Sequence, residues 1–146
     1  MSVTAKDFLE SAIELDGRGV DEMTRRNVVS RAYYAAYHQA SEFVPPIRNE
    51  ENDNVGVHRA YITQLIRGAH GSIERSIGKT IQSMYTRRRK ADYKLEQHLK
   101  LDEGELQIIA AKDLFVEIEN AKANPTITAN SNASSAQGKP KLRIIK

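Results

Sequence analysis

The sequence contains no cysteine. This absence excludes disulfide bridges, a thiolate nucleophile and thiolate metal ligands, and it fits a reducing cytoplasm, where we expect the chain to act. No stretch has the roughly 18 apolar residues in a row that a membrane-spanning helix needs. The start, MSVTAKDFLES, lacks a basic segment followed by an apolar one, so we expect neither a secretory signal nor a membrane partner.

Signatures of metal and cofactor enzymes are also absent. The sequence has no glycine-rich phosphate loop, no Walker motif and no GxSxG motif. The spacing of His58, His70 and His98 does not match the ligands of a zinc site such as HExxH. We therefore expect chemistry that uses neither a metal nor a cofactor.

The composition fits a globular protein. Of the 146 residues, 40% are hydrophobic and 28% are charged, and this length suits a single domain. The net charge is +3 and the isoelectric point is about 9.2. A mildly basic chain is compatible with an RNA partner, but the charge alone does not indicate one.

Apolar residues recur with a helical period up to about residue 122, and turn residues divide this region into segments. We expect helices over about 4–16, 20–44, 55–68, 72–99 and 102–122. We expect Thr4 with Asp7 to cap the first of these helices, and Asp102 with Glu105 to cap the fifth. Either Asp53 or Asn54 should cap the third. Short connections favour antiparallel neighbours, so the predicted fold is an all-α, antiparallel four- to five-helix bundle over residues 1–123.

Residues 124–146 differ from the bundle in composition. Asn, Ser, Thr, Ala and Gly dominate residues 124–138, which we expect to form a linker. The last eight residues, KPKLRIIK, combine four cations with Leu142, Ile144 and Ile145. We expect this peptide to dock on a protein partner or on a neighbouring subunit, with a solvated tail as the alternative.

The stretch SRAYYAAYHQA, residues 30–40, places an arginine, a tyrosine and a histidine along one side of its helix. Arg31, Tyr34 and His38 are spaced i, i+3 and i+7, beside small alanines. Phosphodiester cleavage requires proton transfer, which an imidazole performs near neutral pH, and neutralisation of phosphoryl charge, which a guanidinium supplies. The alternative is structural: Arg31 would pair with a carboxylate and His38 with a backbone carbonyl at a helix interface.

The apolar stripe of segment 72–99 leads to Arg88 and Asp92, one helical turn apart. An inward arginine and aspartate at this spacing should form a structural ion pair, because an isolated buried charge is costly. Arg88 is also a candidate substrate-binding residue. The outer face of the same segment could guide a phosphate backbone, or it could simply be solvated; its cations are Arg75, Lys79, Arg87, Arg89, Lys90 and Lys94.

Three stretches in this order resemble the HEPN superfamily: SRAYYAAYH at residues 30–38, VGVHRAYI at residues 55–62 and MYTRRRKADY at residues 84–93. The match is closest to small stand-alone HEPN proteins and covers roughly residues 4–122. The signature of the superfamily is an arginine followed, after four to six residues, by a histidine. Arg31 and His38, with six residues between them, fit that signature.

The resemblance implies a helical bundle that forms a homodimer, with Arg31 and His38 facing their copies across the interface. It implies a metal-independent endoribonuclease of a toxin–antitoxin or antiviral defence system, in which the 2′-hydroxyl of RNA attacks the adjacent phosphorus. Arg31 and His38 would be the catalytic residues, Tyr34 and Arg88 would bind substrate, and an antitoxin or effector complex would be the protein partner. Ala32 stands where active members often carry a polar residue, so the alternative is a catalytically inactive HEPN-like binding or assembly subunit.

Overall fold

The computed structural model describes residues 2–18, 21–47 and 56–124, and within these ranges the chain forms five α-helices and no strand. The helices are α1 (Ala5–Arg18), α2 (Glu22–Phe43), α3 (Val57–Ile66), α4 (Ile73–Tyr93) and α5 (Glu103–Ala123). The predicted all-α fold is confirmed. The tail, predicted to be a linker and a docking peptide, lies outside the described residues from position 125 onward.

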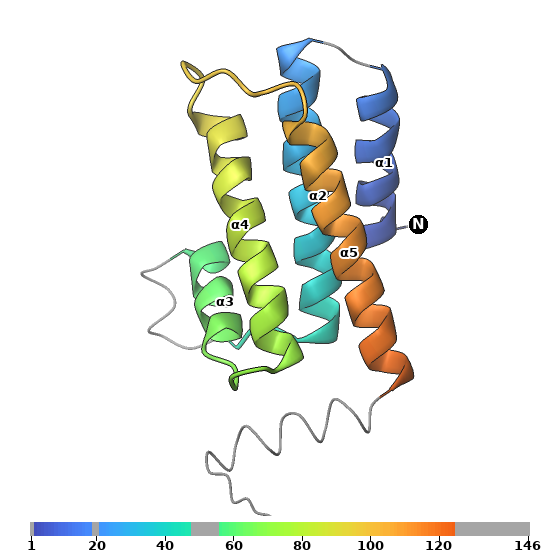
Figure 1. Cartoon of the computed structure of the whole chain (residues 1–146), viewed down its shortest axis with the longest axis vertical. Coiled ribbons are helices and arrows are strands. Elements are labelled where there is room, and N and C mark those ends of the chain that lie inside the picture. Colours follow the sequence, from blue (N-terminus) through green and yellow to red (C-terminus); the bar gives the residue numbers. More distant parts are fainter. Residues whose placement is uncertain (1, 19–20, 48–55, 125–146) are drawn as a thin grey trace, which may run out of the picture.

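The long helices form an antiparallel bundle (Figure 1). The central pair is α2 and α5, and α1 and α4 each pack against both of these helices. In Figure 1, α1 and α4 therefore lie on opposite sides of the pair, and the short α3 packs against α4 at one end. Among the described residues, no helix combines the length and apolar character needed to cross a membrane.

The core forms along the alanine face of α2. Ala32, Ala35, Ala36 and Ala40 are completely buried. Their small side chains allow neighbouring helices to approach closely, and larger residues from those helices fill the space between them. These larger residues include Tyr61, Leu65, Ile77, Ile81, Met84, Leu114 and Ile118.

The predicted first cap is confirmed. The Asp7 carboxylate accepts a hydrogen bond of 2.7 Å from the Thr4 amide, and the Thr4 hydroxyl accepts one of 3.3 Å from the Asp7 amide. At the start of α2, the Asp21 carboxylate accepts from the Thr24 amide at 2.9 Å. These contacts satisfy N–H groups that have no partner within the helix.

Two predicted caps are wrong. α3 begins only at Val57, and its N-cap position is occupied by Gly56, with φ of 76°, rather than by Asp53 or Asn54. A positive φ favours glycine, which has no Cβ to clash. At the start of α5, the Asp102 side chain makes no capping hydrogen bond. Instead the Glu103 carboxylate accepts from the Lys100 amide at 2.7 Å, so the predicted Asp102–Glu105 box does not form.

The predicted end of the fourth helix is also wrong, because α4 stops at Tyr93 rather than near Leu99. The cause is Arg26 of α2, whose side chain is only 5% exposed. Its guanidinium donates to the backbone carbonyls of Lys90, Ala91 and Gln97 and pairs with Glu22 at 2.8 Å. Ala91 lies in the last turn of α4, where carbonyls lack an N–H partner within the helix, and the buried Arg26 supplies that donor from another helix.

Candidate functional site

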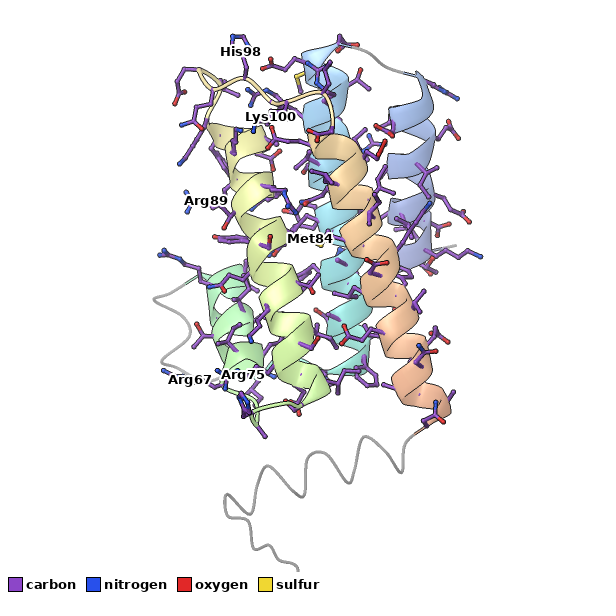
Figure 2. The ribbon with its side chains drawn as sticks, viewed as in Figure 1. Arg67, Arg75, Met84, Arg89, His98 and Lys100 are labelled. Atoms are coloured by element: carbon purple, nitrogen blue, oxygen red, sulfur yellow. The ribbon has the colours of Figure 1, made fainter. Side chains whose placement is uncertain are left out.

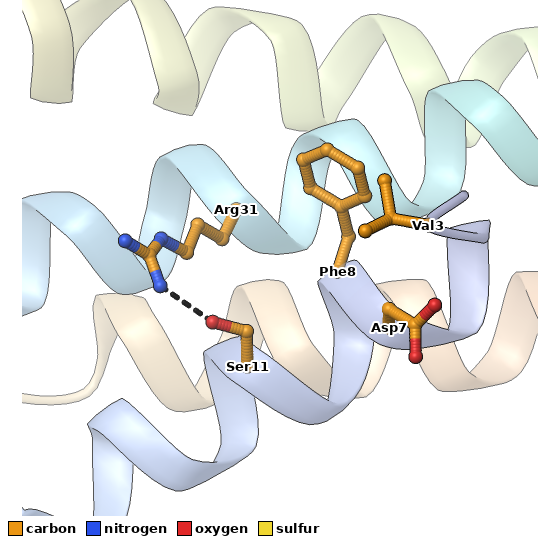
Figure 3. A pocket seen from close by; sticks show the side chains of 5 residues that line it. All are labelled: Val3, Asp7, Phe8, Ser11 and Arg31. Atoms are coloured by element: carbon orange, nitrogen blue, oxygen red, sulfur yellow. Dashed lines mark hydrogen bonds between the residues drawn. The ribbon is translucent and has the colours of Figure 1, made fainter. Parts of the chain in front are cut away.

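Arg31 and His38 both lie on the side of α2 that meets α1, but they have different neighbours. The exposed Arg31 donates a short hydrogen bond from Nη1 to the Ser11 hydroxyl of α1 (Figure 3). The half-buried His38 packs its ring against Phe8 of α1, with 5.1 Å between ring centroids. Within the described chain, the two predicted catalytic residues share no hydrogen bond or ring contact.

Arg31 and His38 line two different open hollows on the surface. The Arg31 hollow, of about 300 Å³, is lined by Val3, Asp7, Phe8, Ser11 and Arg31, as Figure 3 shows. The His38 hollow, of about 420 Å³, is lined by Val3, Thr4, Ala5, Phe8, His38, Ser41 and Glu42. Val3 and Phe8 line both hollows, so the Phe8 side chain lies between the predicted arginine and histidine. Both volumes fall at the lower end of the range of about 300–1,000 Å³ found for small-ligand sites.

Tyr34 connects His38 to the predicted ion pair. The Tyr34 ring stacks on the His38 ring, with centroids 6.0 Å apart and planes 28° apart. Arg88 Nη2 donates to the Tyr34 hydroxyl at 2.9 Å. Arg88 Nε donates to Asp92 at 2.9 Å, and the Ser30 hydroxyl donates to the same Asp92 oxygen at 3.2 Å. The structure therefore brings together the two substrate-binding candidates, Tyr34 and Arg88, and His38 lies beside them.

Arg88 is a fixed positive charge in this site. Its side chain is 11% exposed and that of Asp92 is 27% exposed. Burial alone would lower the pKa of Arg88, but the neighbouring Tyr34 and Asp92 outweigh burial and raise it. The guanidinium centre also lies 5.3 Å from the centroid of the Tyr34 ring, which is within cation–π range.

Sequence reasoning did not single out His58 of α3, which belongs to the same site. The His58 ring lies 4.5 Å from that of Tyr37 and 5.7 Å from that of Tyr34, centroid to centroid. Its Nδ1 atom is 2.8 Å from the Tyr33 hydroxyl oxygen. A signal was present in the sequence, because His58 shares a helix face with the buried Tyr61 and Leu65 at spacings of three and seven residues.

The environment of His58 favours its neutral form. Burial lowers the pKa of His58 most, and the positive charges of Arg88 and His38 lower it further. Burial also raises the pKa of the adjacent Tyr33 and Tyr37 hydroxyls above their ordinary value, so both stay protonated. We call the set formed by Tyr33, Tyr34, Tyr37, His38, His58, Tyr85 and Arg88 the histidine–tyrosine cluster.

The cations predicted on the outer face of α4 do not all face outward. Arg87 Nη1 donates to Gln107 of α5 at 3.3 Å, and Lys90 pairs with Glu103 at 3.2 Å. By contrast, Arg89 is exposed and points away from the bundle on the side of α4 opposite α5 (Figure 2). Its guanidinium centre lies 6.0 Å from the Tyr85 ring, so Arg89 adds positive charge next to the histidine–tyrosine cluster.

The site therefore combines two imidazoles, a fixed guanidinium and several aromatic faces. Among the described residues, no group of three or more His, Cys, Asp or Glu side chains is arranged to hold a metal ion. Comparisons with protein-family models, with curated proteins and with solved structures find no match to this chain, so membership of the HEPN superfamily stays a prediction.

Proposed function

We propose that this protein is a metal-independent endoribonuclease whose reaction takes place at His38, in the histidine–tyrosine cluster. The observation that carries the proposal is the Arg88–Tyr34–His38 arrangement. A buried guanidinium donates to Tyr34 at 2.9 Å, and the Tyr34 ring stacks on an imidazole that lines an open hollow. Within the described chain the His38 ring nitrogens form no hydrogen bond, so they are free to exchange protons with a ligand.

The proposed reaction is cleavage by the 2′-hydroxyl of RNA. The 2′-oxygen forms a bond to the adjacent phosphorus and loses its proton to a base, while the bond from phosphorus to the 5′-oxygen breaks and that oxygen takes up a proton. The products are a 2′,3′-cyclic phosphate and a 5′-hydroxyl. His38 would serve as the base or the acid, and Arg31 or Arg88 would neutralise the charge that develops on the phosphoryl oxygens.

Aromatic side chains support RNA rather than a smaller phosphodiester as the substrate. Phe8, Tyr34 and His38 form a group of three rings in mutual contact, with centroids 5.1 Å apart for Phe8 and His38, 6.0 Å for Tyr34 and His38, and 6.3 Å for Phe8 and Tyr34. Single-stranded RNA is recognised largely by stacking of unpaired bases on such rings. The exposed Arg89, next to Tyr85, would attract the adjoining backbone.

One observation favours a second candidate, an RNA-binding module without catalysis. Arg31 directs its guanidinium to Ser11, and Phe8 lies between the Arg31 hollow and the His38 hollow. A single chain therefore does not present Arg31 and His38 to one phosphate. In the catalytic proposal, a second copy related by two-fold symmetry would bring the same patch from both chains together and supply the missing partner.

Incubation with total RNA in EDTA tests the proposal, with His38→Ala as the variant and His98→Ala as its matched control. His98 is a suitable control because its side chain is 93% exposed on the loop after α4. Wild type and His98→Ala should release products with cyclic phosphate and 5′-hydroxyl ends. His38→Ala should cleave at least about 100-fold more slowly, the usual scale of acid–base catalysis. Binding of RNA without cleavage by the wild type would support the second candidate instead.

A further inference from the structure

The ring of His58 is held in one orientation between α2 and α4. On the α2 side its centroid lies 4.5 Å from that of Tyr37 and 5.5 Å from that of Tyr33. On the α4 side it stacks on Tyr85, with centroids 6.0 Å apart and planes 23° apart. Rings on both sides leave the imidazole little freedom to rotate, so its two nitrogens point in defined directions.

The buried Tyr33 hydroxyl selects the tautomer of His58. Tyr33 is completely buried, and His58 Nδ1, at 2.8 Å, is the only hydrogen-bond partner of its hydroxyl among the described residues. A buried O–H group needs an acceptor, so Tyr33 donates and Nδ1 accepts. The neutral imidazole then carries its proton on Nε2. Protonation of Nδ1 would remove the acceptor of Tyr33.

The Nε2–H group of His58 is left for a ligand. Within the described chain it has no hydrogen-bond partner, and it is not one of the buried polar atoms that lack a partner. His58 is only partly buried, so Nε2 is accessible to solvent.

The surroundings indicate which ligand group would meet this donor. A fixed N–H requires an acceptor, and the charged or titratable groups facing His58 are Arg88 and Tyr85 on α4 and His38 and the tyrosines on α2. Arg88 carries a permanent positive charge, and Arg89 adds a second next to Tyr85. An anionic acceptor is favoured there, because charge-assisted hydrogen bonds are the stronger ones.

We propose that His58 is a substrate-positioning residue that donates a hydrogen bond from Nε2 to a non-bridging phosphate oxygen of RNA bound beside His38. This inference rests on the proposed function, since it takes RNA as the ligand of the same site. His58 acts as a neutral donor, and proton transfer belongs to His38. The two histidines of one chain therefore have different tasks, and α3 contributes to the site as well as α2 and α4.

The probe is an RNA oligonucleotide methylated on every 2′-oxygen, which binds without being cut. Its dissociation constant is measured by fluorescence anisotropy for the wild type, His58→Asn and His58→Gln. The asparagine oxygen can accept from Tyr33 in place of Nδ1, but no group reaches the position of Nε2. The glutamine amide N–H does reach it. His58→Asn should weaken binding about tenfold, as for one lost hydrogen bond to a charged group, and His58→Gln should stay within about threefold of the wild type.

Nitrogen-15 NMR of the wild type supplies a second measurement that does not depend on the folding of a variant. The His58 signals should show the Nε2–H tautomer above pH 7, and the Nε2–H signal should shift when the methylated oligonucleotide is added. Equal dissociation constants for wild type and His58→Asn, or an Nε2–H signal that stays in place, would overturn the proposal.

The outcomes for His58 and for the ribonuclease proposal can be told apart. If the wild type binds the oligonucleotide with the His58 pattern but leaves total RNA intact, His58 positions RNA in a binding module and the catalytic proposal is wrong. If the wild type cuts RNA while His58→Asn binds and cuts as well as wild type, only the His58 proposal is wrong. If the wild type neither binds the methylated oligonucleotide nor cuts total RNA, both proposals are wrong; if it cuts total RNA without binding the oligonucleotide, only the His58 proposal is wrong.

Discussion

Asp92→Ala should destabilise the fold more than most substitutions at partly exposed positions do. Asp92 accepts hydrogen bonds from Arg88 Nε at 2.9 Å and from the Ser30 hydroxyl at 3.2 Å. Removal of its carboxylate leaves the Arg88 charge, with a side chain that is only 11% exposed, without its ion-pair partner. Breaking a fully buried pair costs about 3–5 kcal/mol, and a hydrogen bond to a charged group contributes about 1.5–3 kcal/mol. Because the Asp92 side chain is 27% exposed, water offsets part of this cost, and we expect a loss of about 2–3 kcal/mol.

Urea unfolding followed by circular dichroism measures this loss in the free energy of unfolding. Asp92→Asn keeps an acceptor oxygen for Arg88 but not the charge, so it should lose about half as much. Asp113→Ala, at an exposed position of α5, is the matched control and should change stability by less than about 0.5 kcal/mol. A loss for Asp92→Ala as small as that of the control would contradict this prediction, since it would mean that Arg88 is solvated without Asp92.

Three further predictions concern the helix ends and the position of α3. Arg26→Met should cost about 3 kcal/mol in urea unfolding, since the Ala91 and Gln97 carbonyls lose a charged donor and Glu22 loses its ion-pair partner. The control Arg18→Met, at a side chain that is 72% exposed, should cost less than about 1 kcal/mol. Gly78→Ala should cost about 1–3 kcal/mol and shift the NMR signals of His58, because the new Cβ would lie 2.8 Å from Leu65 Cβ of α3. The control Gly17→Ala should not destabilise the fold, because its new Cβ would have no atom within 4 Å. The stability that depends on neutral His58 is complete above the unfolded-state pKa of about 6.5 and is lost as pH falls toward the lowered pKa of the folded state. Between pH 7 and 5 the melting temperature should therefore fall less for His58→Gln than for the wild type. Equal losses of stability for the two arginine variants, or for the two glycine variants, would contradict the first two predictions. An equal fall in melting temperature for His58→Gln and the wild type would contradict the third.

Features of the fold that depend on nearby residues could be predicted from the sequence. The helix predicted over residues 20–44 is α2, which spans Glu22–Phe43, and its end is a local feature because two prolines follow Val44. The end of α4 was missed because its cause is Arg26, more than sixty residues earlier in the chain. No local pattern in segment 94–99 shows that an arginine from α2 will bind its carbonyls.

The same distinction applies to the candidate site. The Arg88–Asp92 pair follows from i, i+4 spacing within one helix, and it forms. The hydrogen bond from Arg88 to Tyr34 joins two helices, and so does the contact between His58 and Tyr33. These contacts depend on how α3 and α4 are placed against α2, which helical periodicity does not determine.

The central claim is that the 2′-hydroxyl of RNA attacks the adjacent phosphorus in the site at His38. The most direct measurement is mass spectrometry of the products from one RNA oligonucleotide that the protein cuts, compared with the same oligonucleotide carrying 2′-deoxyribose at the cut nucleotide, both in EDTA. We expect a 2′,3′-cyclic phosphate and a 5′-hydroxyl from the first oligonucleotide, no cut at that position in the second, and almost no cleavage of either by His38→Ala. Cleavage of the deoxy position, a 3′-hydroxyl with a 5′-phosphate, undiminished activity of His38→Ala, or a wild type that cuts no RNA at all would contradict it.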